Sequence, residues 1–369
     1  MKVLFVLEHF YPYIGGAEKL FYVLSTNLVR QGYEVVVVTT LYDKKLPKNE
    51  IHKGVEIIRV KCYNRFGFTF LSIPKIIQNA KGCNLIHTTT YNAALPAILS
   101  GKLTGKPVFV TFHEVWANLW KRLPFTSFLA KNAFYYFEKL LLNLPFHKFI
   151  AVSEFTKTEL IDHGIPENKV ERIYNGIDYE TFKEYKHNSP DLYTYTYFGR
   201  LGISKGLDLL IPAAFKFRKI YPDSRLKLII PKQPKGIFDK IRRLVSTYEL
   251  DEYIEFHHNL SKERLHEEVL NSSCVVIPSY SEGFCFAAAE TVALGVPIIS
   301  SDLGALKEVV SGKHIKMAEQ SVDGLKDALI EAYQANWKAD PIRYYPLEES
   351  IDRYMEMYKR LKPERLKHK

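Results

Sequence analysis

The residues best suited to chemistry gather in two short segments, and the first is the run YFGRLGISKG that ends at Gly206. Arg200 follows an apolar strand pattern, and Lys205 stands just before an amphipathic helix pattern. Two cations around a tight loop suit a diphosphate leaving group, because the negative charge that develops on it must be stabilised. The alternative interpretation is a pair of solvent-exposed loop cations.

The second segment is SYSEGFCFAAAETVALGVP, residues 279–297, which follows the apolar run CVVIP. We expect a helix of small residues to begin near Phe284, so that its first amides, at residues 284–286, form a diphosphate site at the positive end of the helix dipole. A carboxylate at Glu282 or Glu290 could accept both hydroxyls of a ribose. The alternative is that Glu282 is a solvated loop acid and Glu290 a partner of the helix dipole.

Short apolar runs that alternate with helical patterns must position these segments, and they predict parallel sheets covered by helices on both faces. The first set of expected strands is 2–7, 34–40, 55–60, 85–88, 108–112 and 148–152. The second set is 193–198, 226–230, 253–257, 274–278 and 297–300. A polar stretch at 183–191 separates the sets and is typical of a linker.

The length of 369 residues predicts two domains, at about 150 residues each. The expected fold class is α/β, with two tandem Rossmann-like domains that face a cleft. We place the first domain at 1–187 and the second at 188–345, followed by a final helix within 346–369 for which the first domain is a candidate surface. Two such domains usually bind a nucleotide or a sugar in the cleft between them.

Several motifs together resemble the retaining glycosyltransferases of family 4, which have the GT-B fold. In chain order they are GGAE (Gly15 to Glu18), FHE (Phe112 to Glu114), YNGID (Tyr174 to Asp178), GR-x4-KG (Gly199, Arg200, Lys205, Gly206) and E-x7-E (Glu282, Glu290). The closing pattern YYPLEESIDRYMEMYKRL also resembles the final helix of that family. Each motif is weak alone, but the series covers nearly the whole chain.

The resemblance implies a role for each matching residue. Arg200 and Lys205 would hold the diphosphate of a nucleotide-sugar donor, and Glu282 would bind hydroxyls of the donor sugar. His113 would lie on the acceptor side, near the anomeric carbon; its alternative is a structural histidine at a strand end. The stretch 175–178 would shape the floor of the cleft, or it is a plain Asn-Gly turn.

The implied reaction is retaining transfer of a hexose through an oxocarbenium-like state, in which the departing phosphate accepts the acceptor proton. No cofactor and no metal are expected, because cations and a helix dipole stabilise the leaving group. The residues expected to take part in the transfer are His113, Arg200, Lys205 and Glu282. Those expected to bind the donor are Gly15, Gly16, Arg200, Lys205, Glu282, Phe284, Cys285, Phe286 and Glu290, with Glu290 on the ribose.

Two positions depart from the family pattern and leave the specificity open. Cys285 stands where the family often has Gly, so it could narrow the donor-sugar pocket. Glu114 stands where the family often has Asp, on the acceptor side. The identity of the sugar, the nucleotide and the acceptor is therefore not predicted.

The segment 115–149 is unusually aromatic and basic. It holds ten aromatic residues, five cations and a single acid, Glu138. Such a segment is typical of an interface with anionic lipid headgroups, and 63–77 has similar character. The alternative is that many of these aromatics belong to the core. The first interpretation predicts a lipid or lipid-linked acceptor and a protein that is peripheral at the cytoplasmic face of a membrane.

Composition bounds the remaining possibilities. The net charge of +10 suits nucleic acid, phosphate-bearing ligands or anionic membrane, and does not choose among them. The four cysteines form no C-x-x-C pair, so neither a zinc site nor a disulfide framework is expected. No segment reaches the roughly 18 apolar residues of a spanning helix, which favours a cytoplasmic protein.

Two other functional classes compete with a transferase. A non-catalytic GT-B module that binds membrane or nucleic acid is the main alternative, but such a module need not keep all five residues His113, Arg200, Lys205, Glu282 and Glu290; nucleic acid is not the expected partner. A dehydrogenase is disfavoured because the first loop, EHFYPYIGGAEK, lacks G-x-G-x-x-G.

Overall fold

The computed structural model describes residues 1–13 and 15–361, which form two compact units. The first unit comprises Met1–Val115, Phe137–Gly176 and the described residues from Tyr345 onward. The second comprises Trp116–Tyr136 and Ile177–Tyr344. The sequence predicts domain boundaries after residues 187 and 345. In the structure the chain passes from one unit to the other after residues 176 and 344, and the stretch 116–136 belongs to the second unit.

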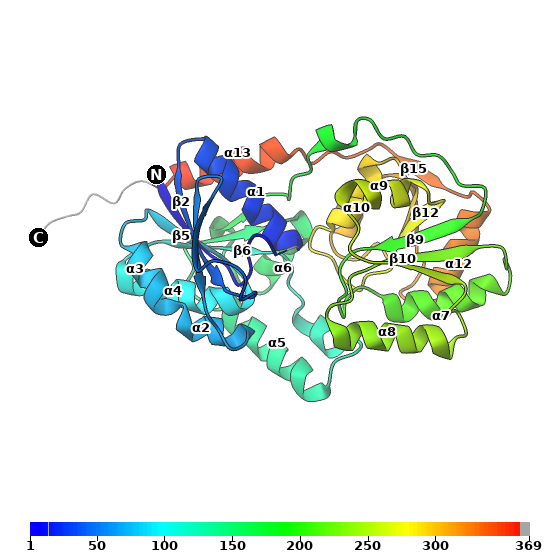
Figure 1. Cartoon of the computed structure of the whole chain (residues 1–369), viewed down its shortest axis with the longest axis horizontal. Helices are drawn as coiled ribbons and strands as arrows, with labels where there is room; N and C mark the ends of the chain where they lie inside the picture. Colours follow the sequence, from blue (N-terminus) through cyan, green and yellow to red (C-terminus); the bar gives the residue numbers. More distant parts are fainter. Residues whose placement is uncertain (14, 362–369) are drawn as a thin grey trace, which may run out of the picture. The chain divides into compact units, whose positions relative to one another are not determined.

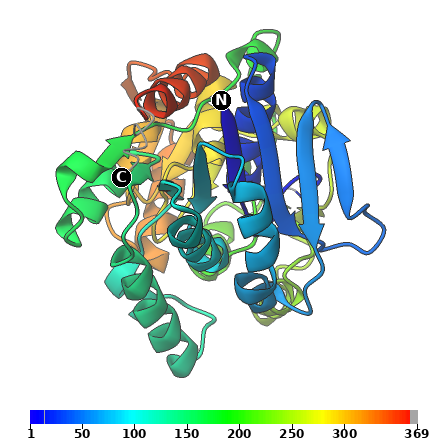
Figure 2. The ribbon, with the colours of Figure 1, turned by 90° about the vertical axis from the view of Figure 1, so that its left-hand side faces the viewer.

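The first unit is built on an eight-stranded sheet of order β3-β4-β2-β1-β5-β6-β7-β8, in which only β3 pairs antiparallel among the described strands (Figures 1 and 2). Its central strands are buried on both faces, which explains their nearly unbroken apolar sequences. The strands are β1 (Lys2–Val6), β2 (Glu34–Thr40), β3 (Asn49–His52), β4 (Val55–Val60), β5 (Leu85–Thr89), β6 (Val108–Phe112), β7 (Lys148–Ala151) and β8 (Val170–Arg172).

Helices flank this sheet, and the last of them comes from the far end of the chain. They are α1 (Gly16–Arg30), η1 (Arg65–Gly67), α2 (Phe68–Leu71), α3 (Ile73–Ala80), η2 (Tyr91–Ala93), α4 (Ala94–Thr104), α6 (Glu154–Asp162), η4 (Glu167–Lys169) and α13 (Leu347–Lys359). The helix α5 (Phe128–Leu142) has residues in both units. α13 packs into the core beside α1 through Tyr354, Met357 and Tyr358. The prediction that the final helix returns to the first domain is confirmed.

A buried histidine ties α13 to the sheet. The Nδ1 atom of His87, on β5, makes a hydrogen bond with the hydroxyl of Tyr358, and its Nε2 atom lies 2.8 Å from Oγ1 of Thr111 on β6. Burial lowers the pKa of His87 to about 3, and the charge of His113 acts in the same direction. The ring is therefore neutral at physiological pH and acts as a hydrogen-bonding link between two strands and the helix.

The YNGID motif lies where the chain leaves the first unit and later re-enters it. A Cβ atom on Gly176 would lie 2.3 Å from Cα of Leu347, at the start of α13. The rings of Tyr174 and Tyr345 meet edge to face with centroids 4.9 Å apart. Glycine is therefore required at this position because two backbone segments cross in contact.

The second unit has a seven-stranded sheet of order β11-β10-β9-β12-β13-β14-β15, parallel except for its edge strand β15. Taken in chain order, β9 to β14 have the 3-2-1-4-5-6 arrangement of a Rossmann fold, whose direction of winding reverses between β9 and β12. The strands are β9 (Thr194–Phe198), β10 (Arg225–Ile229), β11 (Ile254–His257), β12 (Cys274–Ile277), β13 (Ile298–Ser300), β14 (Gly312–Lys316) and β15 (Lys338–Asp340).

One face of this second sheet packs an apolar core against α7, α8 and α12. The helices and turns of the unit are η3 (Ala117–Lys121), η5 (Tyr179–Phe182), α7 (Leu207–Arg218), α8 (Lys235–Thr247), α9 (Lys262–Leu270), α10 (Phe286–Ala293), α11 (Leu306–Val309) and α12 (Val322–Tyr333). Among the helices that the structure describes, none combines the length and apolarity that a bilayer crossing requires.

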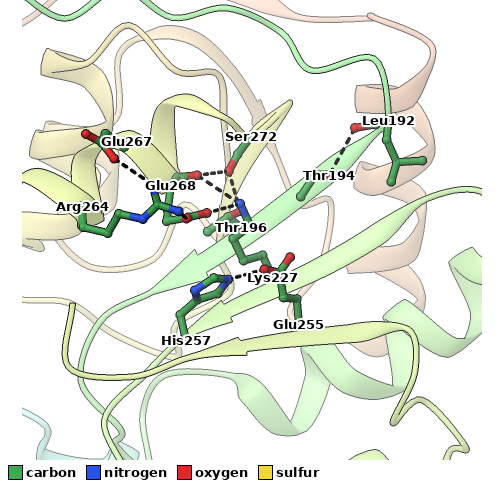
Figure 3. Close-up of polar contacts among 10 residues, drawn as sticks. All are labelled: Leu192, Thr194, Thr196, Lys227, Glu255, His257, Arg264, Glu267, Glu268 and Ser272. Atoms are coloured by element: carbon green, nitrogen blue, oxygen red, sulfur yellow. Dashed lines mark hydrogen bonds and ion pairs between the residues drawn. The ribbon is translucent and has the colours of Figure 1, made fainter.

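The opposite face carries an ionic network whose lysine and glutamate are buried (Figure 3). Lys227 of β10 lies 2.6 Å from Glu268 of α9, and Arg264 lies 2.7 Å from the other oxygen of that carboxylate. Burial alone would raise the pKa of Glu268, but the hydrogen bond and charge of Lys227, together with the charges of His257 and Arg264, outweigh it and lower the pKa. Ser272 bonds Thr196 of β9 and the carbonyl of Glu268. The network fixes α9 on the sheet through directed contacts.

The crossing at Gly176 makes a prediction about stability. Gly176→Ala is expected to lower the free energy of unfolding of the first unit by about 1–3 kcal/mol, because the new methyl group forces two backbones apart. Gly82→Ala is the matched control, since nothing lies within 4 Å of its Cβ position. Urea unfolding followed by circular dichroism compares the two variants. Equal midpoints in both would contradict the packing role of Gly176.

Candidate functional site

The candidate residues of the second unit lie at the reversal point of its sheet. The loop 199–206 follows β9, and the loop 278–285 follows β12, its neighbour in the sheet. Ligands of open α/β sheets bind at this point, beyond the carboxyl ends of the strands. Arg200 and Lys205 come from the first loop and Glu282 from the second, so the fold brings both predicted segments to one edge.

A direct ion pair joins the two loops. The Nζ atom of Lys205 lies 2.8 and 2.9 Å from the two carboxylate oxygens of Glu282. The hydroxyl of Ser279 donates to the same carboxylate at 2.7 Å. The side chain of Glu282 is only 8% exposed, whereas that of Lys205 is 21% exposed. Glu282 is therefore not a solvated loop acid, and Lys205 retains access to solvent.

A third loop, which follows β13, holds the backbone of Glu282. Ala305 donates its N–H to the carbonyl of Glu282 at 2.8 Å. A Cβ atom on Gly304 would lie 2.5 Å from that carbonyl oxygen, and the φ of Gly304 is +62°. Sequence patterns did not predict this contact. Its only local signal is a glycine soon after a strand, in SDLGA.

Further contacts lock the loops after β9 and β12 together. Tyr280 donates its N–H to the carbonyl of Ser204 at 2.7 Å and its hydroxyl to Asp208 at 2.6 Å. Burial raises the pKa of Asp208, and the hydrogen bond from Tyr280 partly opposes that shift. A Cβ atom on Gly206 would lie 1.9 Å from the carbonyl oxygen of Pro278. Glycine at 206 thus permits the close approach that the ion pair needs.

Arg200 occupies the exposed rim of the same edge. It follows Gly199, whose φ of +143° turns the chain out of β9. The hydroxyl of Tyr197 donates to the carbonyl of Arg200 at 3.2 Å and so fixes its backbone. The Arg200 side chain is exposed. The loop therefore offers one cation in an ion pair and a second at the surface.

The helix α10 begins later than expected, at Phe286. Cys285 precedes it with a φ of +69°, a left-handed conformation that glycine adopts far more easily. Burial raises the pKa of the Cys285 thiol, and the charge of Glu282 raises it further. The rings of Phe284 and Phe286 flank this turn, 5.4 Å apart. Glu290 lies half-buried in the second turn of α10, beyond the first-turn position of a dipole partner.

The first unit has a polar cluster at its own reversal point, between β1 and β5. Glu8 follows β1, and its carboxylate lies 2.9 Å from the amide nitrogen of Asn92, which follows β5. Nε of Arg65 lies 3.0 Å from the same carboxylate. Glu8 was not among the predicted site residues, although an acid directly after the first strand of a Rossmann-like domain was a usable signal.

The predicted residues of the first unit lie in this unit's loops. Gly15 caps α1 in an extended conformation, and Gly16 is the first residue of that helix. His113 follows β6, is half-buried, and has its ring 6.2 Å from that of Phe21. The roles of Gly15, Gly16 and His113 remain predictions.

A buried arginine shapes the loop that precedes Gly15. The side chain of Arg59, on β4, is fully buried and lies 2.7 Å from Glu50. It also donates to the carbonyl of Tyr11 at 3.0 Å. Arg59 thus anchors the loop after β1 to the β3–β4 hairpin. Across the described part of the chain, no three His, Cys, Asp or Glu side chains gather as a metal site.

Two family models match the chain one after the other. "Glycosyltransferase Family 4" matches residues 14–181, and "Glycosyl transferases group 1" matches residues 178–345. The chain belongs to the family 4 glycosyltransferases. Their GT-B architecture of two Rossmann-like domains agrees with the two sheets described above.

Three similar proteins illustrate the range of this glycosyltransferase's relatives. One subunit of the phosphatidylinositol N-acetylglucosaminyltransferase of Arabidopsis thaliana is 23% identical over 90% of this chain and 74% of its own. The GDP-mannose:cellobiosyl-diphosphopolyprenol alpha-mannosyltransferase of Xanthomonas oryzae is 25% identical over 82% and 79%. Sucrose-phosphate synthase of Thermosynechococcus elongatus is a solved structure with a TM-score of 0.81 and 19% identity, covering 98% of both chains, and it shows the shared fold.

The Lys205–Glu282 pair makes a prediction about stability that does not depend on activity. Lys205→Met is expected to lower the free energy of unfolding of the second unit by about 2 kcal/mol, because it leaves a buried carboxylate without its cation. Adding Glu282→Gln should recover part of that loss, since a neutral amide is easier to bury. All three tryptophans lie in the second unit, so urea unfolding followed by their fluorescence reports on it.

The exposed pair Lys216–Asp323 supplies the control for this cycle. Lys216→Met should leave the unfolding midpoint nearly unchanged, because solvent screens that pair. Strictly additive effects of the Lys205 and Glu282 substitutions would show that the two side chains do not interact.

Proposed function

We propose that this glycosyltransferase moves a hexose from a nucleotide-diphosphate sugar to an acceptor hydroxyl, with retention of the anomeric configuration. The observation that carries the proposal is the ion pair of Lys205 with the buried Glu282 at the reversal point of a Rossmann sheet. It joins a cation for a diphosphate and a carboxylate for sugar hydroxyls at the edge where such folds bind ligands.

The proposed donor site uses both interlocked loops. Arg200 and Lys205 would bind the diphosphate. The ammonium of Lys205 would exchange the carboxylate of Glu282 for phosphate oxygens. Glu282 would bind the sugar hydroxyls, and Glu290 the ribose. The backbone at residues 284–286 would donate to the phosphates, although α10 begins only at the last of these residues.

The proposed reaction depends on electrostatic stabilisation of the leaving group. As the bond between the anomeric carbon and the phosphate oxygen breaks, negative charge grows on the diphosphate, and Arg200 and Lys205 oppose it. The departing phosphate would take the proton of the acceptor hydroxyl as the new glycosidic bond forms on the same face. We assign Gly15 and Gly16 to the approach of the first-unit loop, and His113 to the acceptor side. With two cations in place, we propose that no metal is needed.

The proposed acceptor is a lipid or a lipid-linked glycan at the cytoplasmic face of a membrane. The names of two relatives pair a transferase with phosphatidylinositol and with a diphosphopolyprenol. In the segment 115–149, Phe128 and Leu129 are 78% and 80% exposed at the start of α5. Trp120 is buried instead and stacks on Phe134, so part of this segment is core. We propose that the exposed end of α5 contacts anionic lipid.

The donor assignment predicts a loss of rate without a loss of fold. Arg200→Ala and Lys205→Ala are each expected to slow transfer by about 10²–10³-fold, the usual effect of removing one group that stabilises a developing anion. Lys235→Ala, which removes a cation of the same unit on α8, is the control. The measurement is release of nucleoside diphosphate from a panel of UDP-, GDP- and ADP-sugars. Rates near wild type in both variants, measured at a temperature where both remain folded, would refute the diphosphate site.

The metal-free mechanism predicts that activity survives chelation. Turnover of the preferred nucleotide-sugar in excess EDTA should match turnover in Mg²⁺, because Arg200 and Lys205 supply the positive charge. A matched assay of Lys205→Ala in Mg²⁺ tests whether a metal can replace the side chain. Complete inactivation by EDTA that Mn²⁺ or Mg²⁺ reverses would contradict the proposal.

A further inference from the structure

Positive charge is enriched in a stretch of the sequence that includes α2, α3 and α4. Residues 57–153 hold twelve Lys and Arg but only two acids, Glu114 and Glu138. This excess of ten equals the net charge of the whole chain, so the remaining residues carry equal numbers of cations and acids. Glu138 is 2% exposed and Glu114 is half-buried, so neither offsets the surface cations. Several cations of this stretch are exposed, Lys75 and Lys102 among them.

Within this stretch, α2, α3 and α4 contact one another in the first unit (Figure 1). The helix α4 faces the sheet with small residues, and a Cβ atom on Gly101 would lie 2.2 Å from Val108. Ile98 is also buried, but two leucines of the same helix are not: Leu99 is 45% and Leu103 72% exposed. A solvated helix normally keeps its large apolar residues against the core, so the two exposed leucines depart from that pattern.

The short helices η1 and α2, which precede α3, carry further exposed apolar side chains. Phe66 is 57% exposed and Phe70 is 74% exposed, and Leu71 beside them is 44% exposed. The contacting helices also carry exposed cations, Lys75 on α3 and Lys102 on α4. We call the set the α2–α4 surface; its members are Phe66, Phe70, Leu71, Lys75, Leu99, Lys102 and Leu103.

We propose that the α2–α4 surface lies on an anionic lipid bilayer, with its apolar side chains at the acyl boundary and its lysines at the headgroup phosphates. Apolar and cationic side chains together are what such a surface requires, because each Lys adds electrostatic attraction to the burial of apolar area. A second copy of the chain fits less well, since a twofold contact would bring like charges together. Nucleic acid would gain nothing from the exposed leucines.

The inference deepens the proposed function and rests on it for the lipid-linked acceptor, but the lipid contact itself is measured without catalysis. Wild-type full-length protein is sedimented with vesicles of phosphatidylcholine alone, and with vesicles that also contain phosphatidylglycerol. Binding is expected only to the anionic vesicles, and it should weaken as salt rises.

Two variants of the α2–α4 surface separate its two components. Lys75→Glu with Lys102→Glu, and Phe70→Ser with Leu103→Ser, should each lower the vesicle partition coefficient about tenfold or more. The matched controls are Lys44→Glu with Lys45→Glu, and Ile51→Ser, which alter exposed residues of the same unit outside the surface. The controls should bind like wild type. Charge reversal at Lys121, Arg122 and Lys131 measures the contribution of the segment 115–149 in parallel.

The possible results distinguish this inference from the proposed function. If the surface variants lose vesicle binding but still hydrolyse nucleotide-sugar, the lipid surface is supported; if the wild type lacks turnover but binds vesicles as described, only the proposed function fails. Equal binding to neutral vesicles, unchanged binding of both surface variants, or no binding by the wild type would overturn the inference. Light scattering could show a dimer, or gel shift an RNA complex. Either result would also overturn the inference if the same variants disrupted that complex without any effect on lipid binding.

Discussion

The carboxylate of Glu282 is buried and therefore needs polar partners within the protein. That requirement organises the edge of the second sheet. Lys205 meets it from the loop after β9, Ser279 from its own loop, and Ala305 fixes its backbone from the loop after β13. Three loops that are distant in sequence therefore converge on one buried charge. Glycine is required at positions 206 and 304 for the same reason, because any side chain there would push the loops apart.

The second unit has another lysine–glutamate pair, and comparison of the two indicates different roles. The Lys227–Glu268 pair is sealed, with both side chains below 10% exposed, and it connects a strand to a helix. Lys205 is 21% exposed and connects two loops. A sealed pair resists exchange because each ion would lose its partner in a medium of low polarity. The more open pair at Lys205 can exchange a carboxylate for a phosphate with much less loss, which suits a binding site.

Sequence patterns predicted the strands that an apolar run of their own marks. They missed the strands that form only by pairing with a neighbouring strand. All eleven expected strands are present, and the final helix lies over residues 347–359 within the expected region. The missed strands β3, β8, β14 and β15 are short, and β15 is fully exposed, so no apolar run marks them. Their hydrogen bonds depend on neighbours that only the assembled sheet supplies.

The same distinction holds for the site. Arg200, Lys205 and Glu282 could be proposed from the sequence because charged residues beside strand ends and glycines are visible locally. Their pairing was not predicted, since it depends on β9 and β12 being neighbours in the sheet. Gly304 was missed because its reason for being glycine, the backbone of Glu282, lies 22 residues earlier in the chain.

Cys285 lies at a position where the backbone geometry favours glycine. Its φ of +69° lies in the left-handed region, which costs a residue with a Cβ atom about 1 kcal/mol more than glycine. That conformation also ends the helical backbone before Glu282, so α10 begins at Phe286, two residues after the expected start. The thiol of Cys285 stays protonated, because burial and the charge of Glu282 raise its pKa. Under the proposed function, a neutral side chain thus occupies space next to the carboxylate that binds sugar hydroxyls, where a glycine would leave room for a larger substituent.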